Sequence, residues 1–314
     1  MKNTIGTPYD DVFRTQLIDC SWLIIPVINE VFNENYDESE TVILWQNEHF
    51  ILGDTKRITD SMIQIGKLSK KLYHIECESS PEDGSVIIRV VEYAFNAAIQ
   101  QSMYENGTLT IRLPLSAVLF LRGRNNESNM MITIQTPAGE LSYPVPVIRM
   151  GAYELDELFE KKLYFLLPYY LFNYEADFNK INRDDKALFE FKERYAWIRG
   201  RLQQLQADGK LDIYTVCLLR EMTVKVANGL AANHERIWKG VNETMGGQVL
   251  DYEAKRILNK GREEGRVEGR SEGRVQGREL LAEAIHQLRL GMSEDHLLAS
   301  GYDQETIDLA KTCL

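Results

Sequence analysis

The chain has 314 residues, 44% hydrophobic and 26% charged, so its composition fits neither wholesale disorder nor a fibrous repeat. The net charge of −11 argues against a general nucleic-acid coat protein, because such proteins are positively charged overall. The longest apolar stretches, residues 22–28 and 163–172, are shorter than the roughly 20 residues that cross a bilayer. The N-terminus also lacks a signal-peptide pattern. We therefore expect a soluble, cytoplasmic protein.

The metal-binding residue types are scattered. The four cysteines lie far apart in the sequence and the five histidines do not cluster. Zinc sites and small disulfide scaffolds need such residues at short, regular spacings. We therefore predict no zinc site, and we expect the thiols to be unpaired and buried.

The first 150 residues predict a mixed α/β domain, because short alternating runs and helical periodicities follow one another. In chain order, the predicted elements are a helical entry over 8–34, strands over 41–45, 57–65 and 71–79, a helix over 85–104, a buried strand over 116–123 and a hairpin over 131–150.

After residue 150 the sequence becomes helical, with predicted helices over 153–175, 184–207 and 211–233. The change in pattern suggests four parts. These are a mixed α/β domain over 1–150, a helical extension over 151–247, a repeat segment over 248–290 and a small helical module over 291–314. The last part is predicted as two short helices that contact protein, since its second helix is too acidic to approach DNA phosphates.

Residues 261–278 form an internal repeat, in which glycine recurs every fourth residue and each glycine is followed by arginine. One interpretation is a helix whose glycine stripe allows close packing against a second copy, giving a homodimer through residues 250–290. The other interpretation is a flexible hydrophilic linker. RNA binding is less favoured, because glutamates cancel the positive charge and no aromatic residues are interleaved.

Three carboxylates stand out by their position in the predicted strands. Alternation places Asp60 between two apolar residues of one strand, and it places Glu76 and Glu78 on one face of the next. If the two strands pair, the three side chains converge. Converging carboxylates suit Mg²⁺ or Mn²⁺, which can activate water for phosphodiester cleavage. The alternative is an exposed, solvated sheet face.

Two further sets of polar residues lie near these carboxylates in the sequence. The predicted helix carries a polar stripe at helical spacing that can hold a phosphate or orient a carboxylate, or simply face solvent. Its members are Arg89, Glu92, Tyr93, Asn96 and Gln100. The segment from Lys56 to Lys71 contains five basic residues against one acidic residue, Asp60.

These motifs carry a family resemblance. The segments TDSMIQI and LYHIECESSPEDGSVIIRVVEYAFNAAI, with the earlier YDDVFR and the later ELDELFEKKLYFLLPYYL, resemble the PD-(D/E)XK nuclease superfamily. Within it, the chain is most similar to the bacterial recombination-promoting nuclease/putative transposase family, over roughly residues 6–175. The resemblance implies a restriction-endonuclease-like core, a mixed sheet flanked by helices. It also implies a Mg²⁺-dependent DNA endonuclease linked to recombination.

The resemblance assigns roles to single residues. Asp60 and Glu76 match the metal ligands, Asp10 matches the acidic residue of the first helix, and Arg89 and Tyr93 match the helix motif that follows the site. Two residues after Glu76, Glu78 stands where the family has lysine or glutamine. Because a glutamate cannot donate a hydrogen bond, Glu78 either recruits a second ion or marks a degenerate enzyme.

Two functional hypotheses follow. The first is a metal-dependent DNA endonuclease, in which Asp60 and Glu76 hold Mg²⁺ or Mn²⁺ while Lys56, Arg57 and Arg89 offset phosphate charge. The second is a catalytically inactive binding or scaffold protein that keeps the nuclease fold, which the acidic balance and Glu78 favour. Both hypotheses expect a protein without a membrane segment or an organic cofactor.

Overall fold

The computed structural model describes most of the first 246 residues and part of the C-terminal segment. The described residues are 7–45, 48–51, 55–58, 62–66, 71–80, 84–123, 127–246, 281, 285, 287–289, 292–299, 302 and 304–312. The chain divides into two compact units, Met1–Lys255 and Arg256–Leu314. In the described ranges, the helices are too short or too polar to cross a bilayer.

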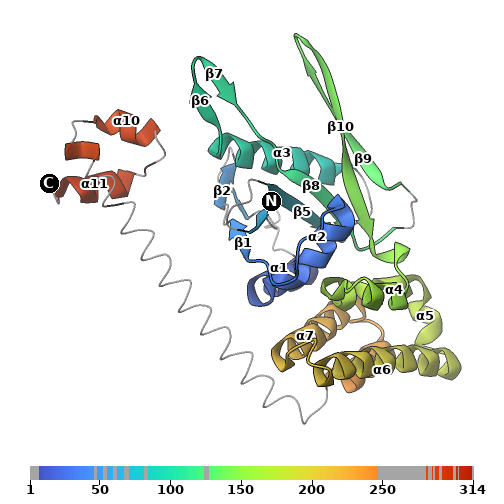
Figure 1. The fold of residues 1–314 in the computed structure, drawn as a ribbon. Coiled ribbons are helices and arrows are strands. Elements are labelled where there is room, and N and C mark those ends of the chain that lie inside the picture. Colours follow the sequence, from blue (N-terminus) through green and yellow to red (C-terminus); the bar gives the residue numbers. More distant parts are fainter. Residues whose placement is uncertain are drawn as a thin grey trace. The chain divides into compact units, whose positions relative to one another are not determined.

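A six-stranded mixed sheet forms the centre of the first unit (Figure 1). Its strands in spatial order are β1 (Val42–Trp45), β4 (Met62–Ile65), β5 (Leu72–Glu78), β8 (Leu115–Phe120), β10 (Gly139–Arg149) and β9 (Asn129–Thr136). The three central strands β5, β8 and β10 run parallel, and the outer pairs are antiparallel. The expected hairpin over 131–150 is confirmed as β9–β10.

One face of the sheet is covered by helix α3 (Ser85–Gln100), which crosses β5 and β8. Its apolar stripe, including Val86 and Val90, packs against Val118 and Phe120 of β8. Parallel strands are buried on both faces, which explains why every residue of β5 is buried. The packing fixes α3 over the carboxyl end of β5.

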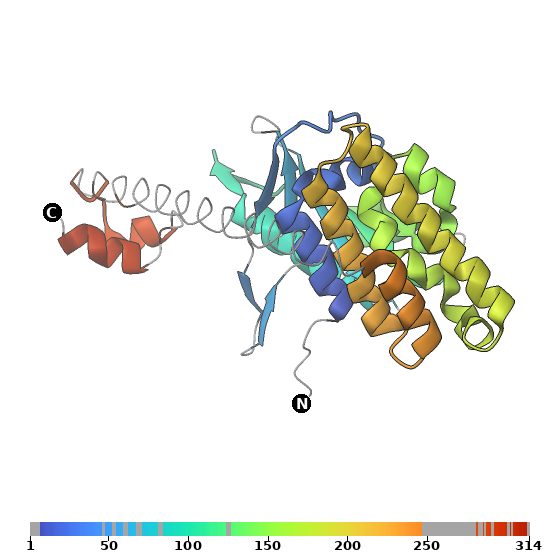
Figure 2. The same ribbon diagram turned by 90° about the horizontal axis from the view of Figure 1, so that it is seen from below.

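The N-terminal helices are α1 (Pro8–Asp19), η1 (Ser21–Ile24) and α2 (Ile25–Phe32), and α2 packs against β10 of the sheet. Phe32 packs against Tyr73 of β5 with ring centroids 5.1 Å apart. Helix α1 also packs along α7 (Ile213–Leu230), as Figure 2 shows. The N-terminal helices therefore contact both parts, with α2 on the sheet and α1 on the helical part.

The helical part follows η2 (Met150–Ala152). Its elements are α4 (Leu155–Glu160), η3 (Tyr164–Asp177), α5 (Phe178–Ile181), α6 (Asp185–Ala207), α7, α8 (Glu235–Val241) and the π-helical η4 (Asn242–Gly246). The helices expected over 184–207 and 211–233 are confirmed. The helix expected over 153–175 is instead a short α-helix followed by a 3₁₀ helix that contains Pro168. Proline removes a backbone donor, which disfavours a continuous α-helix there.

Two small hairpins, β2–β3 and β6–β7, occupy segments for which the sequence predicted other elements. The strand expected over 57–65 is divided between β3 (Thr55–Ile58), which pairs with β2 (Glu48–Ile51), and β4 of the central sheet. The helix expected to reach residue 104 ends at Gln100. The chain then forms a hairpin from β6 (Met103–Glu105) and β7 (Thr108–Thr110).

In the second unit, the expected pair of short helices appears as α10 (Glu294–Ala299) and α11 (Gln304–Thr312). Lys311 of α11 forms an ion pair with Glu294 of α10. The glycine–arginine repeat over 261–278 lies outside the described residues.

Candidate functional site

A row of polar side chains lies on the face of β5 that α3 covers. His74, Glu76 and Glu78 alternate along this strand, and their exposed fractions are 0%, 1% and 9%. Charged side chains are rarely this buried unless they are paired. The alternative interpretation of these glutamates as a solvated sheet face is therefore wrong.

Helix α3 supplies the partner of both carboxylates. Arg89 Nη2 donates a 2.6 Å hydrogen bond to Glu78 Oε2, and Arg89 Nε lies 3.6 Å from Glu76 Oε2. Burial lowers the pKa of Arg89, but the hydrogen bond to Glu78 and the charge of Glu76 outweigh this, so the net effect raises it. The predicted role of Arg89 as an orienter of carboxylates matches this arrangement, and its alternative as a solvent-facing residue does not.

Glu78 is also held by the chain that follows it. Its Oε1 accepts a 2.7 Å hydrogen bond from the backbone N–H of Ser80. Its two carboxylate oxygens are thus divided between Arg89 and the turn after β5. This arrangement fixes the carboxylate at the end of β5.

His74 links Ser116 to Glu76 in a buried relay, which the sequence patterns did not predict. Its Nε2 lies 3.2 Å from Glu76 Oε1, and its Nδ1 lies 3.4 Å from Ser116 Oγ of the neighbouring strand β8. The ring of Tyr93 packs edge-on against the His74 ring at 6.0 Å. The parallel register pairs His74 with Ser116, and alternation in β5 puts His74 on the face of Glu76. The order Ser–His–Glu is that of a hydrolase triad. Ser116 is buried in the middle of the sheet, however, so the relay positions Glu76 rather than presenting a nucleophile.

Arg122 lies at the same end of β5 and β8, and the sequence patterns gave no indication of its role. It follows β8 and donates to the backbone carbonyl of Ser79 just beyond β5. Two further hydrogen bonds of 2.6 and 2.8 Å reach Glu175 of η3, and the guanidinium lies 4.9 Å from the Phe172 ring centroid. The hydrogen bond to Glu175 raises the pKa of Arg122. Arg122 therefore ties the carboxyl end of β5 to the helical part.

The other predicted site residues divide into two groups. Asp10 lies at the start of α1, where its carboxylate accepts the N–H of Thr7 at 2.6 Å in a capping box. That contact gives Asp10 a local structural role, and its proposed role in the site stays a prediction. Asp60 lies outside the described residues, as do the side chains of Lys56 and Arg57 in β3.

The described carboxylates have the ligand chemistry that Mg²⁺ prefers, but they are too few to form a complete site. Glu76 and Glu78 provide carboxylate oxygens, which this ion prefers. Across the part of the chain that the structure describes, however, the His, Cys, Asp and Glu side chains form no group of three or more arranged to hold an ion. A complete cation site therefore requires a further ligand, and Asp60 is the one that the sequence offers.

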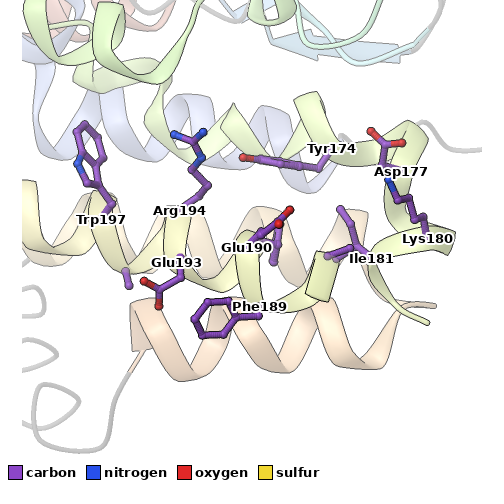
Figure 3. A pocket seen from close by; sticks show the side chains of 12 residues that line it. Tyr174, Asp177, Lys180, Ile181, Phe189, Glu190, Glu193, Arg194 and Trp197 are labelled. Carbon is purple, nitrogen blue, oxygen red and sulfur yellow. The ribbon is translucent and has the colours of Figure 1, made fainter. Parts of the chain in front are cut away.

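A separate groove lies in the helical part, between η3, α5 and α6 (Figure 3). Its volume is about 800 Å³, and Trp197 and Lys180 lie toward its two ends. Its walls carry Lys180 and Arg194 together with Asp177, Glu190 and Glu193. Its basic and acidic side chains nearly balance, and we assign no role to this groove.

Comparisons with known proteins add no identification: no family model, no curated protein and no solved structure matches the chain.

Proposed function

We propose that the chain is a metal-dependent DNA endonuclease with a restriction-endonuclease-like core, centred on Glu76 and Glu78. The observation that carries the proposal is the buried acidic row on β5 beneath Arg89. Its link to recombination or transposition rests on the family resemblance of the sequence alone.

Charge balance supports a cation at this row. In this buried cluster two carboxylates share one guanidinium, so the acidic groups outnumber the arginine by one. Burying an uncompensated charge is costly. In the proposal, Asp60 adds a second negative charge, because it precedes Met62 of β4 by two residues and Met62 pairs with His74. A divalent cation balances that total.

Each residue has a distinct task in this proposal. Glu76 and Asp60 hold Mg²⁺ or Mn²⁺, which supplies an activated water and stabilises negative charge on the phosphate. Arg89 prevents the neighbouring carboxylates from repelling each other and offsets the charge of the DNA backbone. His74 orients Glu76, while Lys56 and Arg57 contact the flanking phosphates.

A second candidate is a catalytically inactive binding or scaffold protein of the same fold. The observation that favours it is the 2.6 Å contact between Arg89 and Glu78, because a guanidinium bound to these carboxylates replaces part of the charge that a metal would supply. In this alternative the acidic row stabilises the fold and has no catalytic role.

Incubation of supercoiled plasmid with the full chain and Mg²⁺ or Mn²⁺ separates the two candidates. We expect nicked or linear plasmid with the wild type and none with Asp60→Ala or Glu76→Gln. Glu140→Ala is the matched control, because Glu140 is an exposed acid at the start of β10.

The control should cleave like the wild type. Absence of cleavage by the wild type with both metals would support the scaffold. Equal cleavage by wild type and Asp60→Ala would indicate a contaminating nuclease or a different centre.

A further inference from the structure

The β6–β7 hairpin and the chain beside it concentrate exposed apolar side chains. The described part of the chain exposes fifteen large hydrophobic side chains, and six of them lie between residues 99 and 115. They are Ile99, Met103, Tyr104, Leu109, Ile111 and Leu115, with exposed fractions from 40% to 73%. Apolar side chains gathered in this way mark an interaction surface more often than scattered ones do.

The hairpin has a regular turn, but its strand residues are all exposed to solvent. Asn106 and Gly107 both have positive φ angles, 51° and 79°, which is the type I′ turn that suits a two-residue hairpin. All six residues of β6 and β7 are exposed, and Figure 1 shows the hairpin standing away from the sheet at the end of α3. An isolated two-stranded hairpin is only marginally stable in water, so a partner that covers it would stabilise it.

A pocket lies at the base of this hairpin. Its volume is about 490 Å³. It is lined by the apolar Trp45, Leu72, Leu113 and Leu115 and by the polar Gln64, Lys71, Gln101 and Arg112. Tyr104 and Leu109, the most exposed apolar residues of the hairpin, are 73% and 55% exposed, so they do not fill the pocket of their own chain.

We propose that the β6–β7 hairpin is a dimerisation arm, which inserts Tyr104 and Leu109 into the Trp45–Leu115 pocket of a second copy of this chain. Because the arm and the pocket adjoin in one chain, a two-fold axis lets each protomer give its arm and receive the other's. The contact is then made twice and the assembly closes as a dimer.

The exposed apolar area of the arm and its pocket approaches that of a standard dimer interface. At roughly 200 Å² for a large side chain, the exposed parts of the six residues amount to about 600 Å². Trp45, which is 38% exposed, adds to this surface. A standard stable interface buries about 800 Å² on each partner, so the arm and its pocket supply most of it.

The test is sedimentation velocity of the full chain over a range of concentrations. We expect the wild type to form dimers and the Tyr104→Ser/Leu109→Ser variant to dimerise about tenfold or more weakly. The matched control is Met131→Ser/Leu141→Ser on the β9–β10 hairpin, where exposure is similar at 60% and 58%. It should dimerise like the wild type, and circular dichroism should be unchanged in both.

Some results would overturn the assignment of the arm. They are a monomeric wild type or a Tyr104→Ser/Leu109→Ser variant that dimerises normally. Dimerisation through residues 250–290 alone gives the second of these results. The inference is independent of the proposed nuclease activity, because sedimentation requires neither metal nor DNA.

Discussion

Replacing Arg89 with methionine tests whether the acidic row on β5 depends on this single cation. Methionine keeps the length and helix propensity of the side chain, so the main loss is the charge. Removing one partner of a buried ion pair costs about 3–5 kcal/mol, because the remaining charge is left uncompensated. Arg89 is 29% exposed, so solvent screens part of the loss, and we expect a cost of about 3 kcal/mol in the free energy of unfolding.

Urea denaturation followed by circular dichroism measures this cost. Adding Glu78→Gln to Arg89→Met should recover about half of it, because one of the two unpaired carboxylates is then removed. Lys186→Met serves as the control, since Lys186 is 86% exposed and should change stability by less than about 0.5 kcal/mol. A cost below about 1 kcal/mol for Arg89→Met would refute the view that Arg89 compensates buried charge.

Three further predictions follow. Burial raises the pKa of Cys20 from 9.0 to about 12 and the pKa of Tyr195 well above 10.0. Both groups ionise first in the unfolded chain, so their contribution to stability is complete below pH 9 and is lost above it. The loss should reach about 1.4 kcal/mol per pH unit for each group, and urea midpoints from pH 8 to 11 that do not change would contradict it. In plasmid assays, Glu78→Gln should preserve or raise cleavage, because glutamine removes a negative charge beside the phosphate and adds a hydrogen-bond donor, while its one oxygen can still accept from Arg89. Complete loss would instead make Glu78 a metal ligand. A chain ending at Gly247 should dimerise more weakly than the full chain if the repeat contributes, and equal sedimentation behaviour of the two would favour the linker interpretation.

The carboxylates and their helix could be predicted from the sequence because both depend on local periodicity. Alternation in β5 places Glu76 and Glu78 on one face, and a spacing of four residues places Arg89 and Tyr93 on one side of α3. The structure confirms that these two sets face each other across the sheet surface. Their burial was not predictable, since it depends on how α3 packs.

The relay through His74 could not be predicted from any local pattern. Its second partner, Ser116, is 42 residues away in sequence and reaches His74 only through the parallel register of β5 and β8. Arg122 and Glu175 are likewise 53 residues apart and belong to different parts of the chain. Contacts of this kind are fixed by topology, which periodicity does not specify.

The β6–β7 hairpin, by contrast, had a readable signal. Asn106-Gly107 is the strongest short turn signal for a hairpin. The apolar run before it also fits a helix, and the helical interpretation therefore extended four residues past Gln100. The run over 57–65 was misjudged for a similar reason, because a single alternating pattern spans β3 and β4, which belong to different sheets.

Isothermal titration of the full chain with Mn²⁺ is the most direct test of a cation centre at the acidic row, since it requires no knowledge of the DNA target. We predict saturable binding by the wild type that is lost in Glu76→Gln, with both proteins folded by circular dichroism. Absence of binding by the wild type, or equal binding by the wild type and Glu76→Gln, would contradict the account.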